Sequence, residues 1–259
     1  MMEKHSTFNI QHSTPEGLGG AQPLDVRRSM LNVEYWFLVN SGKCDAAFNM
    51  ALDEALLEAM PRLQKPVLRF YGWTEPAATF GYFQKYSEVA ATTKLRPLIR
   101  RPTGGGIVPH DADWTYSAAF PPGHEWHSLK AEESYRRIHD WLRLAFAELL
   151  VETELAPCCQ KSLPGQCFVG HEKFDLLWHG KKIAGAAQRR NKLGLLIQGS
   201  VQPPPVPVVR SDWVAALLRV ARRDFSVTWQ DCAFDAELQE RSAKLVQEKY
   251  SQPCYNQKR

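Results

Sequence analysis

A cysteine and a lysine that could take part in nucleophilic catalysis lie fifteen residues apart in the stretch GQCFVGHEKFDLLWHGKKIAGAAQRR, which begins at Gly165. A thiol with a pKa of about 8.5 is only a few per cent thiolate at neutral pH, and a nearby ammonium group raises that fraction. Cys167 has glycine and polar neighbours, and Lys182 follows it across a predicted hairpin. The pattern therefore indicates a thiolate stabilised by Lys182. Without further context, Lys181 and Lys182 are better explained as solvated residues on a turn.

A run of three glycines follows a pair of arginines in RRPTGGGIVPH, residues 100–110. Glycine is needed where the backbone adopts a positive φ or where something lies directly against it. The run is not a phosphate-binding loop, because neither lysine nor a helix signal follows Gly106. It is either a tight loop between two strands or a bare wall for a ligand. Arg101, Thr103 and His110 in the same segment favour the ligand.

The composition is that of a soluble globular protein, with 44% hydrophobic and 23% charged residues. The net charge of +4 is spread along the chain, so it favours an acidic partner slightly and nucleic acid only weakly. No apolar run is long enough to span a bilayer, so we expect no membrane partner. Six cysteines without an apolar N-terminal signal region favour a reducing cytoplasm. CxxC and HExxH spacings are absent, so we expect no metal site.

The elements that must position these residues can be read from hydrophobic periodicity. It predicts helices at residues 45–60, 130–152, 211–223 and 234–250. We expect a turn at Ser41 and Gly42 before the first helix, and Pro61 as its end. Strands are predicted at residues 33–39, 66–73, 96–102, 113–120, 174–178, 181–188 and 193–201. Because strands and helices are mixed without strict alternation, we expect an α/β or α+β domain with helices flanking a mixed sheet.

The two ends of the predicted domain differ in composition from its centre. Residues 1–30 are polar, rich in Gly, Pro, Ser and His, and have no sustained period, so we expect a disordered tail. Residues 31–255 are expected to form one domain. Within it, the sequence PPPVP from Pro203 to Pro207 predicts a stiff extended connection before the last two helices.

Several motifs, in order along the chain, resemble those of the biotin/lipoate protein ligase superfamily. They are NMALDEALL, LRFYGWTEPAATFGYFQ, RRPTGGGIVPHDADWTYS, and GKKIAGAAQRR after the CF at Cys167. The likeness is strongest to the cysteine-dependent octanoyltransferases of the LipM type, and it runs from about Val33 to Val201. The ordered series is more specific than any single motif. The resemblance implies a class II biotin/lipoate ligase-like catalytic domain built on a mixed β-sheet.

The resemblance also implies an activity, that of an octanoyl-[acyl carrier protein]:protein N-octanoyltransferase in lipoate biosynthesis. Such an enzyme takes octanoyl from acyl carrier protein onto a cysteine as a thioester. It then passes the acyl group to a lysine of a lipoyl carrier domain, in the glycine cleavage H protein or a 2-oxoacid dehydrogenase E2. Because thioester exchange keeps the acyl group activated, no cofactor is implied.

The resemblance also implies site residues, by their positions in the family's motifs. Cys167 is the implied nucleophile, and Lys182 is the lysine of the family's GxKxAGxAQ pattern. The implied acyl-binding residues are Arg101, Thr103, Gly104, Gly105, Gly106, His110, Ala184 and Gly185.

Three alternatives remain open. An ATP-dependent lipoate-protein ligase would need ATP and Mg²⁺; Gly106 favours it, because that position is commonly arginine in the transferases and glycine in the ligases. Gln198 also stands where the transferases more often have histidine. Cys167 favours the transferase, because a ligase needs no nucleophile.

An amidotransferase that moves octanoyl or lipoyl groups between carrier domains would use the same cysteine. A catalytically silent protein on this fold would only hold a fatty acyl or biotinyl group.

Overall fold

The fold is known from a computed structural model that describes residues 33–160, 170–232 and 235–258 of the chain. Contacts group Val33–Arg259 as one compact unit. The predicted tail at residues 1–30 and the predicted nucleophile Cys167 lie outside the described residues, so both stay predictions. Among the helices that the structure describes, none is long and apolar enough to cross a membrane.

The main sheet has eight strands within the described residues, in the order β11-β1-β2-β6-β10-β9-β8-β7. Strand β1 pairs in parallel with β2 and β11, and the pairs from β2 to β7 are antiparallel. The strands are β1 (Glu34–Cys44), β2 (Val67–Trp73), β6 (Trp114–Phe120), β7 (Glu154–Leu155), β8 (Leu176–Trp178), β9 (Lys181–Asn191), β10 (Gly194–Val201) and β11 (Val227–Asp231). The mixed sheet predicted from the sequence is confirmed.

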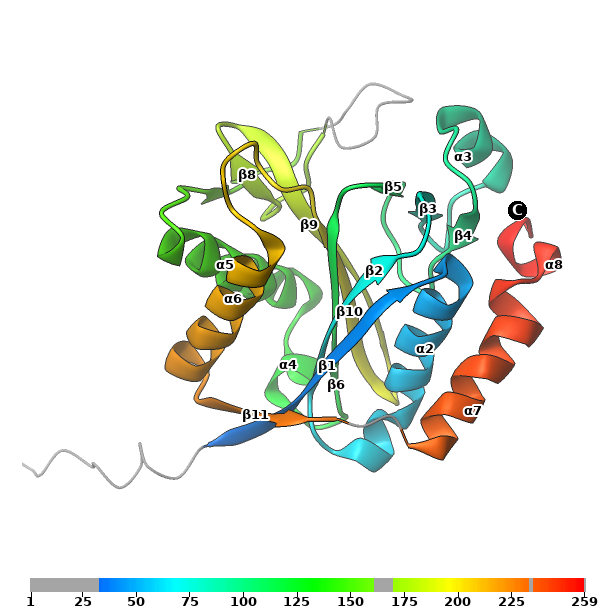
Figure 1. The fold of residues 1–259 in the computed structure, drawn as a ribbon, viewed down its shortest axis with the longest axis horizontal. Helices are drawn as coiled ribbons and strands as arrows, with labels where there is room; N and C mark the ends of the chain where they lie inside the picture. Colours follow the sequence, from blue (N-terminus) through cyan, green and yellow to red (C-terminus); the bar gives the residue numbers. More distant parts are fainter. Residues whose placement is uncertain (1–32, 161–169, 233–234, 259) are drawn as a thin grey trace, which may run out of the picture. The chain divides into compact units, whose positions relative to one another are not determined.

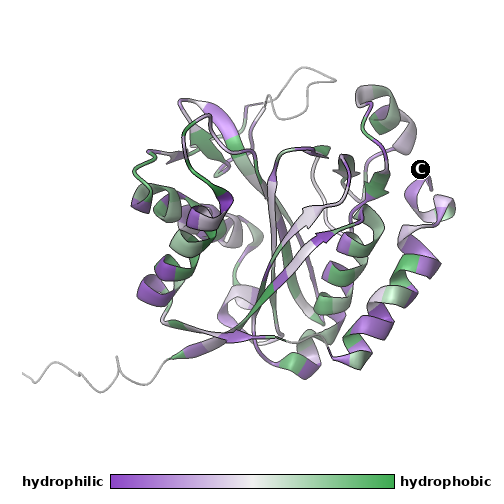
Figure 2. Cartoon of the chain, viewed as in Figure 1, coloured by the Kyte–Doolittle hydropathy of each residue, from purple (hydrophilic) through white to green (hydrophobic). Residues whose placement is uncertain are grey.

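Helices cover both faces of this sheet, as Figure 1 shows. Helix α2 contacts β6 and β10 on one face and packs against α7, while α5 and α6 pack together on the other. The helices of the first face are α2 (Ala46–Leu63), α7 (Ala236–Leu245) and the π-helical η1 (Val246–Tyr250), and those of the second are α4 (Glu125–Ser128), α5 (Ala131–Glu148) and α6 (Arg210–Asp224). In Figure 2, α6 and α7 carry both hydrophilic and hydrophobic residues, which is expected of helices that bury one face against a sheet.

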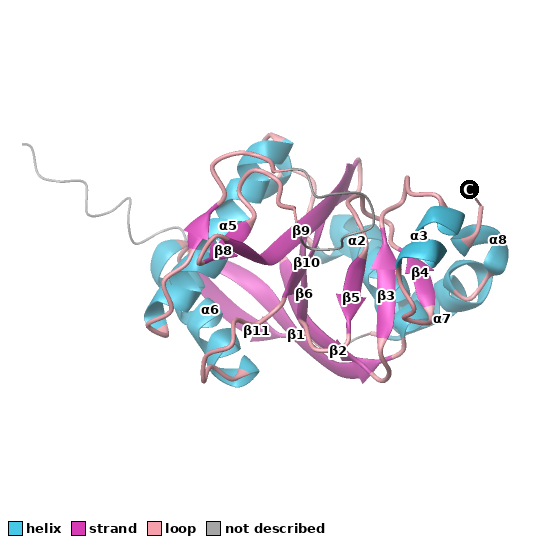
Figure 3. Cartoon of the chain, turned by 90° about the horizontal axis from the view of Figure 1, so that it is seen from above, coloured by secondary structure: helices cyan, strands magenta, loops and turns pink. Residues whose placement is uncertain are grey.

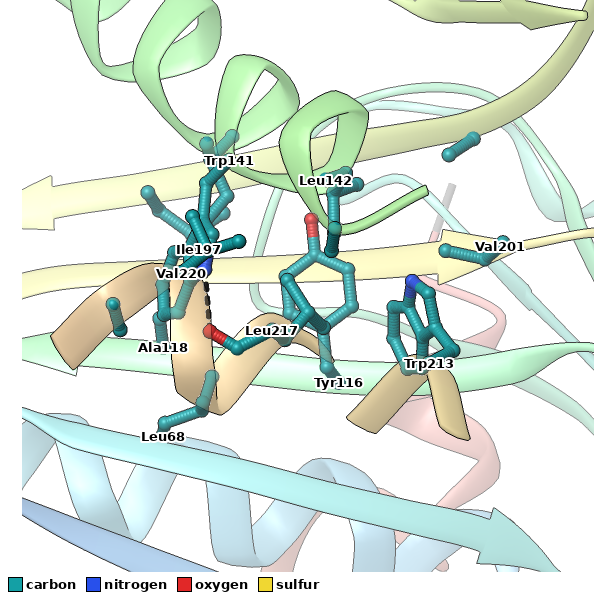
Figure 4. Packing of buried hydrophobic residues seen from close by; sticks show 14 of the residues in the cluster. Leu68, Tyr116, Ala118, Trp141, Leu142, Ile197, Val201, Trp213, Leu217 and Val220 are labelled. Atoms are coloured by element: carbon teal, nitrogen blue, oxygen red, sulfur yellow. Dashed lines mark hydrogen bonds between the residues drawn. The ribbon is translucent and has the colours of Figure 1, made fainter. Parts of the chain in front are cut away.

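Large aromatic side chains form much of the core under α5 and α6. Trp36, Trp141 and Trp213 are almost completely buried, and a buried aromatic side chain removes about 150–250 Å² from water. The indole nitrogen of Trp141 donates a hydrogen bond of 2.9 Å to the carbonyl of Leu217, which ties α5 to α6 (Figure 4). The same core includes Ile183 and Ala184 of β9 and Val201 of β10, which lie next in the chain to residues that line the cavity described below.

A second, smaller sheet carries the glycine run. It consists of β4 (Leu98–Arg100), β3 (Ala77–Phe80) and β5 (Val108–His110), with β3 in the centre. Figure 3 shows these strands beside α3 (Tyr86–Thr92) and α8 (Pro253–Asn256). The glycine run connects β4 to β5. It is therefore a loop between two strands, which is one of the two explanations given above for the run.

The end of the first helix differs from the prediction. Helix α2 continues through Pro61 to Leu63, so Pro61 does not end it. A proline lacks the N–H that would bond to the carbonyl four residues earlier, and its ring crowds that carbonyl, but the residues after it can keep helical dihedral angles. Pro61 lies in the last turn of α2, where only Arg62 and Leu63 follow it in the helix. The helix ends instead at Gln64, which adopts a left-handed conformation with a φ of 54° and donates its N–H to the Met60 carbonyl.

The predicted turn at Ser41 and Gly42 is also wrong, because β1 runs through both residues to Cys44. Its pairing with β2 shifts between Asn40 and Lys43, so Gly42, with a φ of 67°, serves an irregularity within the strand. The short elements α3, β3, β5, β7 and β11 had no separate sequence prediction. They are too short to show a period, and the strands among them pair with residues that do not lie next to them in the sequence.

Candidate active site

A cavity of about 840 Å³ lies between the glycine loop, α3, α5 and the strands β9 and β10. This volume is typical of pockets for small ligands. Six of the residues predicted for the site line it: Arg101, Gly105, Gly106, His110, Lys182 and Gly185. Residues separated by up to 84 positions therefore meet at one cavity.

Three predicted residues stand outside this lining. Ala184 is completely buried in the hydrophobic core that contains Leu176 and Ile183, so it does not form one wall with Gly185. Thr103 is buried and donates its hydroxyl to the Gln198 side chain at 2.8 Å, so it acts through Gln198, which does line the cavity. Gly104 contributes its carbonyl to a hydrogen bond described below.

The glycine loop is packed directly against Gly81, a residue without a sequence prediction. A Cβ atom on Gly81 would lie 2.0 Å from the Gly105 carbonyl oxygen, so only glycine fits there. Gly105 itself has a φ of 86°, a conformation that glycine adopts without strain. A lone glycine after the strand AATF was the available signal, because glycine at a strand end often marks close approach of another backbone.

Gly104 and Gly106 are different, because a Cβ atom on either would meet nothing within 4 Å. Neither has a positive φ. Packing therefore does not require glycine at these two positions. At Gly106, which lines the cavity, the missing side chain leaves bare backbone facing open space. The tight-loop explanation therefore holds for Gly105, and the wall for a ligand stays a prediction for Gly106.

Arg101 fixes the shape of this loop from beneath. Its guanidinium donates to the carbonyls of Gly104 at 2.6 Å and Gly106 at 2.9 Å, and to the Thr79 hydroxyl at 3.1 Å. Burial lowers the pKa of Arg101 to about 10, so it still carries its charge at neutral pH. Arg101 was predicted to bind substrate; the geometry gives it the further role of holding the loop that faces the cavity.

The Thr79 hydroxyl continues this chain of hydrogen bonds to His110. Arginine only donates, so the Thr79 oxygen accepts from Arg101, and the same oxygen lies 2.8 Å from His110 Nε2. His110 Nδ1 then carries the proton that is donated to the Asp113 carboxylate at 2.9 Å. Burial lowers the pKa of His110 despite the neighbouring Asp113. The His110 ring also stacks on Trp73, with ring centroids 3.8 Å apart, so it is held from two sides.

At another part of the cavity wall, Lys182 forms an ion pair with Asp175. The Lys182 Nζ atom lies 2.7 Å from Asp175 Oδ2, and the two side chains are 17% and 3% exposed. The predicted hairpin that brings them together is confirmed: β8 and β9 are joined through His179 and Gly180, both with positive φ. Asp175 had no sequence prediction, although an acidic residue opposite the lysine pair of a hairpin was the available signal.

A buried polar network lies under the cavity floor. Gln198 donates its amide to Asp53 Oδ2 at 2.7 Å, and Asp53 Oδ1 accepts from Arg69 at 2.7 Å and Ser117 at 2.7 Å. Because Asp53 only accepts, the Gln198 amide nitrogen points to it and the amide oxygen points to Thr103. This network fixes the orientation of Gln198, where the sequence already departs from the transferases. Its charged members had no sequence prediction, since Asp53 lies within the periodic pattern of α2 and Arg69 within strand β2.

Two cationic side chains, Arg101 and Lys182, line the site beside bare backbone and hydroxyl groups; Arg101 is bound to the glycine loop and Lys182 is paired with Asp175. Such an arrangement can bind an acyl chain and stabilise negative charge on its carbonyl oxygen. In residues 33–160, 170–232 and 235–258, no group of three or more His, Cys, Asp or Glu side chains could hold a metal ion. Among the cysteines in these ranges, Cys44, Cys158, Cys159 and Cys254 are free thiols.

Comparison with solved structures defines the class of fold. A lipoate-protein ligase A bound with ATP superimposes with a TM-score of 0.72 at 21% identity, covering 86% of this chain and 98% of that one. A bi-partite lipoate protein ligase from Thermoplasma acidophilum gives a TM-score of 0.69 at 19% identity, covering 86% and 96%. The chain therefore has the lipoate ligase fold, which confirms the fold that the resemblance implied.

The sequence identifies the family within that fold. Residues 45–202 match the lipoyl protein ligase A/B catalytic domain family, and the chain belongs to it. The octanoyltransferase LipM of Anoxybacillus flavithermus is 35% identical over 181 residues, and that of Carboxydothermus hydrogenoformans is 38% identical over 175 residues. Both matches span 65% of this chain and 65% of the relative's own length.

Proposed function

We propose that this chain is an octanoyltransferase that acts in protein lipoylation. The observation that carries the proposal is the likeness, at 35% identity over 181 residues, to relatives named octanoyltransferase LipM. The cavity supports it, because the bare glycine loop and the Lys182 side chain line the same cavity. An apolar acyl chain can approach the backbone at Gly106 closely, and the cation can bind its carbonyl oxygen.

The proposed reaction has two steps, with Cys167 as the nucleophile. In the first, the Cys167 thiolate attacks the carbonyl carbon of the octanoyl thioester; a new carbon–sulfur bond forms, the bond to the carrier's sulfur breaks, and the released thiolate takes up a proton. In the second, the neutral amine of the acceptor lysine attacks the same carbon. A carbon–nitrogen bond forms, the bond to the Cys167 sulfur breaks, and the proton lost by the amine restores the thiol.

The partners follow from this reaction. We propose octanoyl-acyl carrier protein as donor and a lipoyl carrier domain as acceptor, either the glycine cleavage H protein or a 2-oxoacid dehydrogenase E2. No metal, ATP or other cofactor is needed, since a thioester enters and a thioester is the intermediate. The reaction would take place in the cytoplasm, where carrier proteins and free thiols coexist.

An ATP-dependent lipoate ligase is the second candidate. Gly106 favours it, because glycine at this position is typical of ligases, and a Cβ atom there would meet open space. The lipoate-protein ligase A of the same fold is bound with ATP. In a ligase, Cys167 would be dispensable.

One assay separates the two candidates. The purified chain is mixed with a lipoyl domain and either octanoyl-acyl carrier protein or free lipoate. Each mixture is tested with and without ATP and Mg²⁺, and the mass of the lipoyl domain is measured by mass spectrometry. We expect octanoylation without ATP and a hydroxylamine-sensitive octanoyl adduct on Cys167. The Cys167→Ser variant should form no such adduct. Modification only with ATP and free lipoate, undiminished in Cys167→Ser, would establish the ligase instead.

A further inference from the structure

Lys182 owes its direction to an irregularity in the hairpin. Leu176 pairs with Ala184 but Leu177 pairs with Lys182, so β9 holds one extra residue, Ile183, opposite β8. In a regular strand, residues three apart point to opposite faces of the sheet. With the extra residue between them, Lys182 and Gly185 share a face, and bulges commonly redirect side chains in this way.

Gly185 is bare because the Lys182 side chain crosses it. A Cβ atom on Gly185 would lie 2.8 Å from Lys182 Cε and 2.9 Å from Nζ, closer than side chains approach. It would also lie 3.1 Å from Asp175 Oδ1. The glycine therefore leaves a niche in which the lysine and the aspartate meet, at a point that lines the cavity.

Asp175 is anchored on its own side of this niche. Its Oδ2 atom accepts the backbone N–H of Glu172 at 2.7 Å as well as the Lys182 ammonium at 2.7 Å. Its backbone carbonyl accepts from the Ala156 N–H at 2.8 Å. An aspartate held by three such contacts and almost fully buried presents its carboxylate in one place.

The surroundings leave this carboxylate available to Lys182. His139 is completely buried near both charges, and burial lowers its pKa to about 4, so it is neutral at neutral pH and does not compete as a second cation. The Tyr135 hydroxyl, whose pKa burial raises to about 12, donates instead to the Ala186 carbonyl.

We propose that Asp175 is a positioning residue, which holds the Lys182 ammonium across the backbone of Gly185 so that it donates a hydrogen bond to the carbonyl oxygen of the bound acyl group. This inference rests on the proposed function. A donor that is already in place gains strength as negative charge develops on that oxygen, without reorganisation during the reaction. Asp175 itself acts through Lys182 and does not touch the substrate.

Two variants separate the roles of the pair. Asp175→Asn keeps an oxygen for the Glu172 N–H and removes the charge that holds Lys182. Gly185→Ala fills the niche, and because the displaced atoms are the end of a flexible lysine, the fold can tolerate it. Asp140→Asn is the matched control, because Asp140 pairs with Arg143 in a partly exposed helix position.

The first measurement needs no enzymatic activity. Lysines are labelled with an amine-reactive ester, and labelling of Lys182 is compared with that of exposed Lys181 by mass spectrometry after cleavage at aromatic residues. We expect Asp175→Asn and Gly185→Ala to raise the ratio of Lys182 to Lys181 labelling about ten-fold, and Asp140→Asn to leave it unchanged. An unchanged ratio in Asp175→Asn would overturn the inference.

The second measurement uses octanoyl transfer. We expect Asp175→Asn to lower kcat roughly 10²-fold while KM for the acyl donor stays within about three-fold, because the donor acts mainly on developing charge. In a Lys182→Ala background, Asp175→Asn should have little further effect. Equal losses in both backgrounds would overturn the inference. A parent chain without transfer activity would contradict the proposed function, whereas the labelling would still decide whether Asp175 positions Lys182.

Discussion

The three glycines of the loop have two separate physical roles. Gly105 is needed for the fold, because its φ is 86° and a Cβ atom would lie 3.1 Å from the Arg101 guanidinium. Gly106 is not needed for the fold, because a Cβ atom there would meet only the open space of the cavity. Substitutions at Gly105 and at Gly106 should therefore have different effects on the stability of the fold.

Alanine at Gly105 should change stability, whereas alanine at Gly106 should change substrate binding. We expect Gly105→Ala to lower the free energy of unfolding by about 1–2 kcal/mol, the cost of left-handed backbone for a residue with a Cβ atom. Gly106→Ala should leave the free energy of unfolding unchanged and raise KM for the octanoyl donor. Urea denaturation and steady-state kinetics on both variants provide the check; equal destabilisation would refute the distinction.

At the scale of elements, the C-terminal helix α8 supports the small sheet through Arg100. The Arg100 backbone N–H donates to Asn256 Oδ1 at 2.9 Å, and its guanidinium donates to the Asn256 carbonyl at 3.0 Å. The same guanidinium reaches the carbonyls of Tyr82 and Gln84, both at 2.7 Å, in the turn that follows Gly81. A helix more than 150 residues away thus supports the backbone on which the glycine loop packs.

Removing the Asn256 side chain should therefore destabilise the small sheet. Asn256→Ala leaves the buried Arg100 N–H without its acceptor, and we expect a loss of about 1–3 kcal/mol in the free energy of unfolding. The neighbouring exposed residue gives the control, since Gln257→Ala should change stability by less than about 0.5 kcal/mol. Chemical denaturation of both variants is the measurement, and indistinguishable midpoints would argue against this support.

At the scale of the whole molecule, one buried histidine couples stability to pH. Neither ring nitrogen of His139 forms a hydrogen bond within the described part of the chain. Burial lowers its pKa to about 4, against about 6.5 in an unfolded chain. The unfolded state thus binds a proton first, so the stabilising contribution is complete above about pH 6.5 and is lost as the pH falls toward 4. His110, with a pKa also lowered by burial, acts in the same direction.

Replacing His139 by phenylalanine should reduce this pH dependence. Between pH 7.5 and pH 5, we expect the parent chain to lose about 2 kcal/mol of unfolding free energy through His139, and His139→Phe to keep that amount. His127→Phe, at a partly buried position, is a control that should follow the parent chain. Urea titrations at the two pH values test this, and parallel curves for His139→Phe and the parent would exclude His139 as the cause.

The sequence by itself determined what depends on local pattern and residue type. The period of residues 45–60 and 130–152 gave their helices, the alternation around His179 and Gly180 gave the hairpin, and the ordered motifs gave the family. Residue type also pointed to Lys182 and to the glycine loop, because few environments need an ammonium group beside bare backbone.

The tertiary structure alone decided which residues meet. The contact of Gly81 with Gly105, the pairing of Asp175 with Lys182, and the burial of Ala184 away from Gly185 depend on strand register and on one extra residue in β9. Register is set by long-range pairing and packing, and a shift of one residue reverses every side chain between cavity and core. The hairpin sequence offered an acidic residue opposite the lysine pair, but only the register of β8 and β9 shows that Asp175 and Lys182 meet across Gly185.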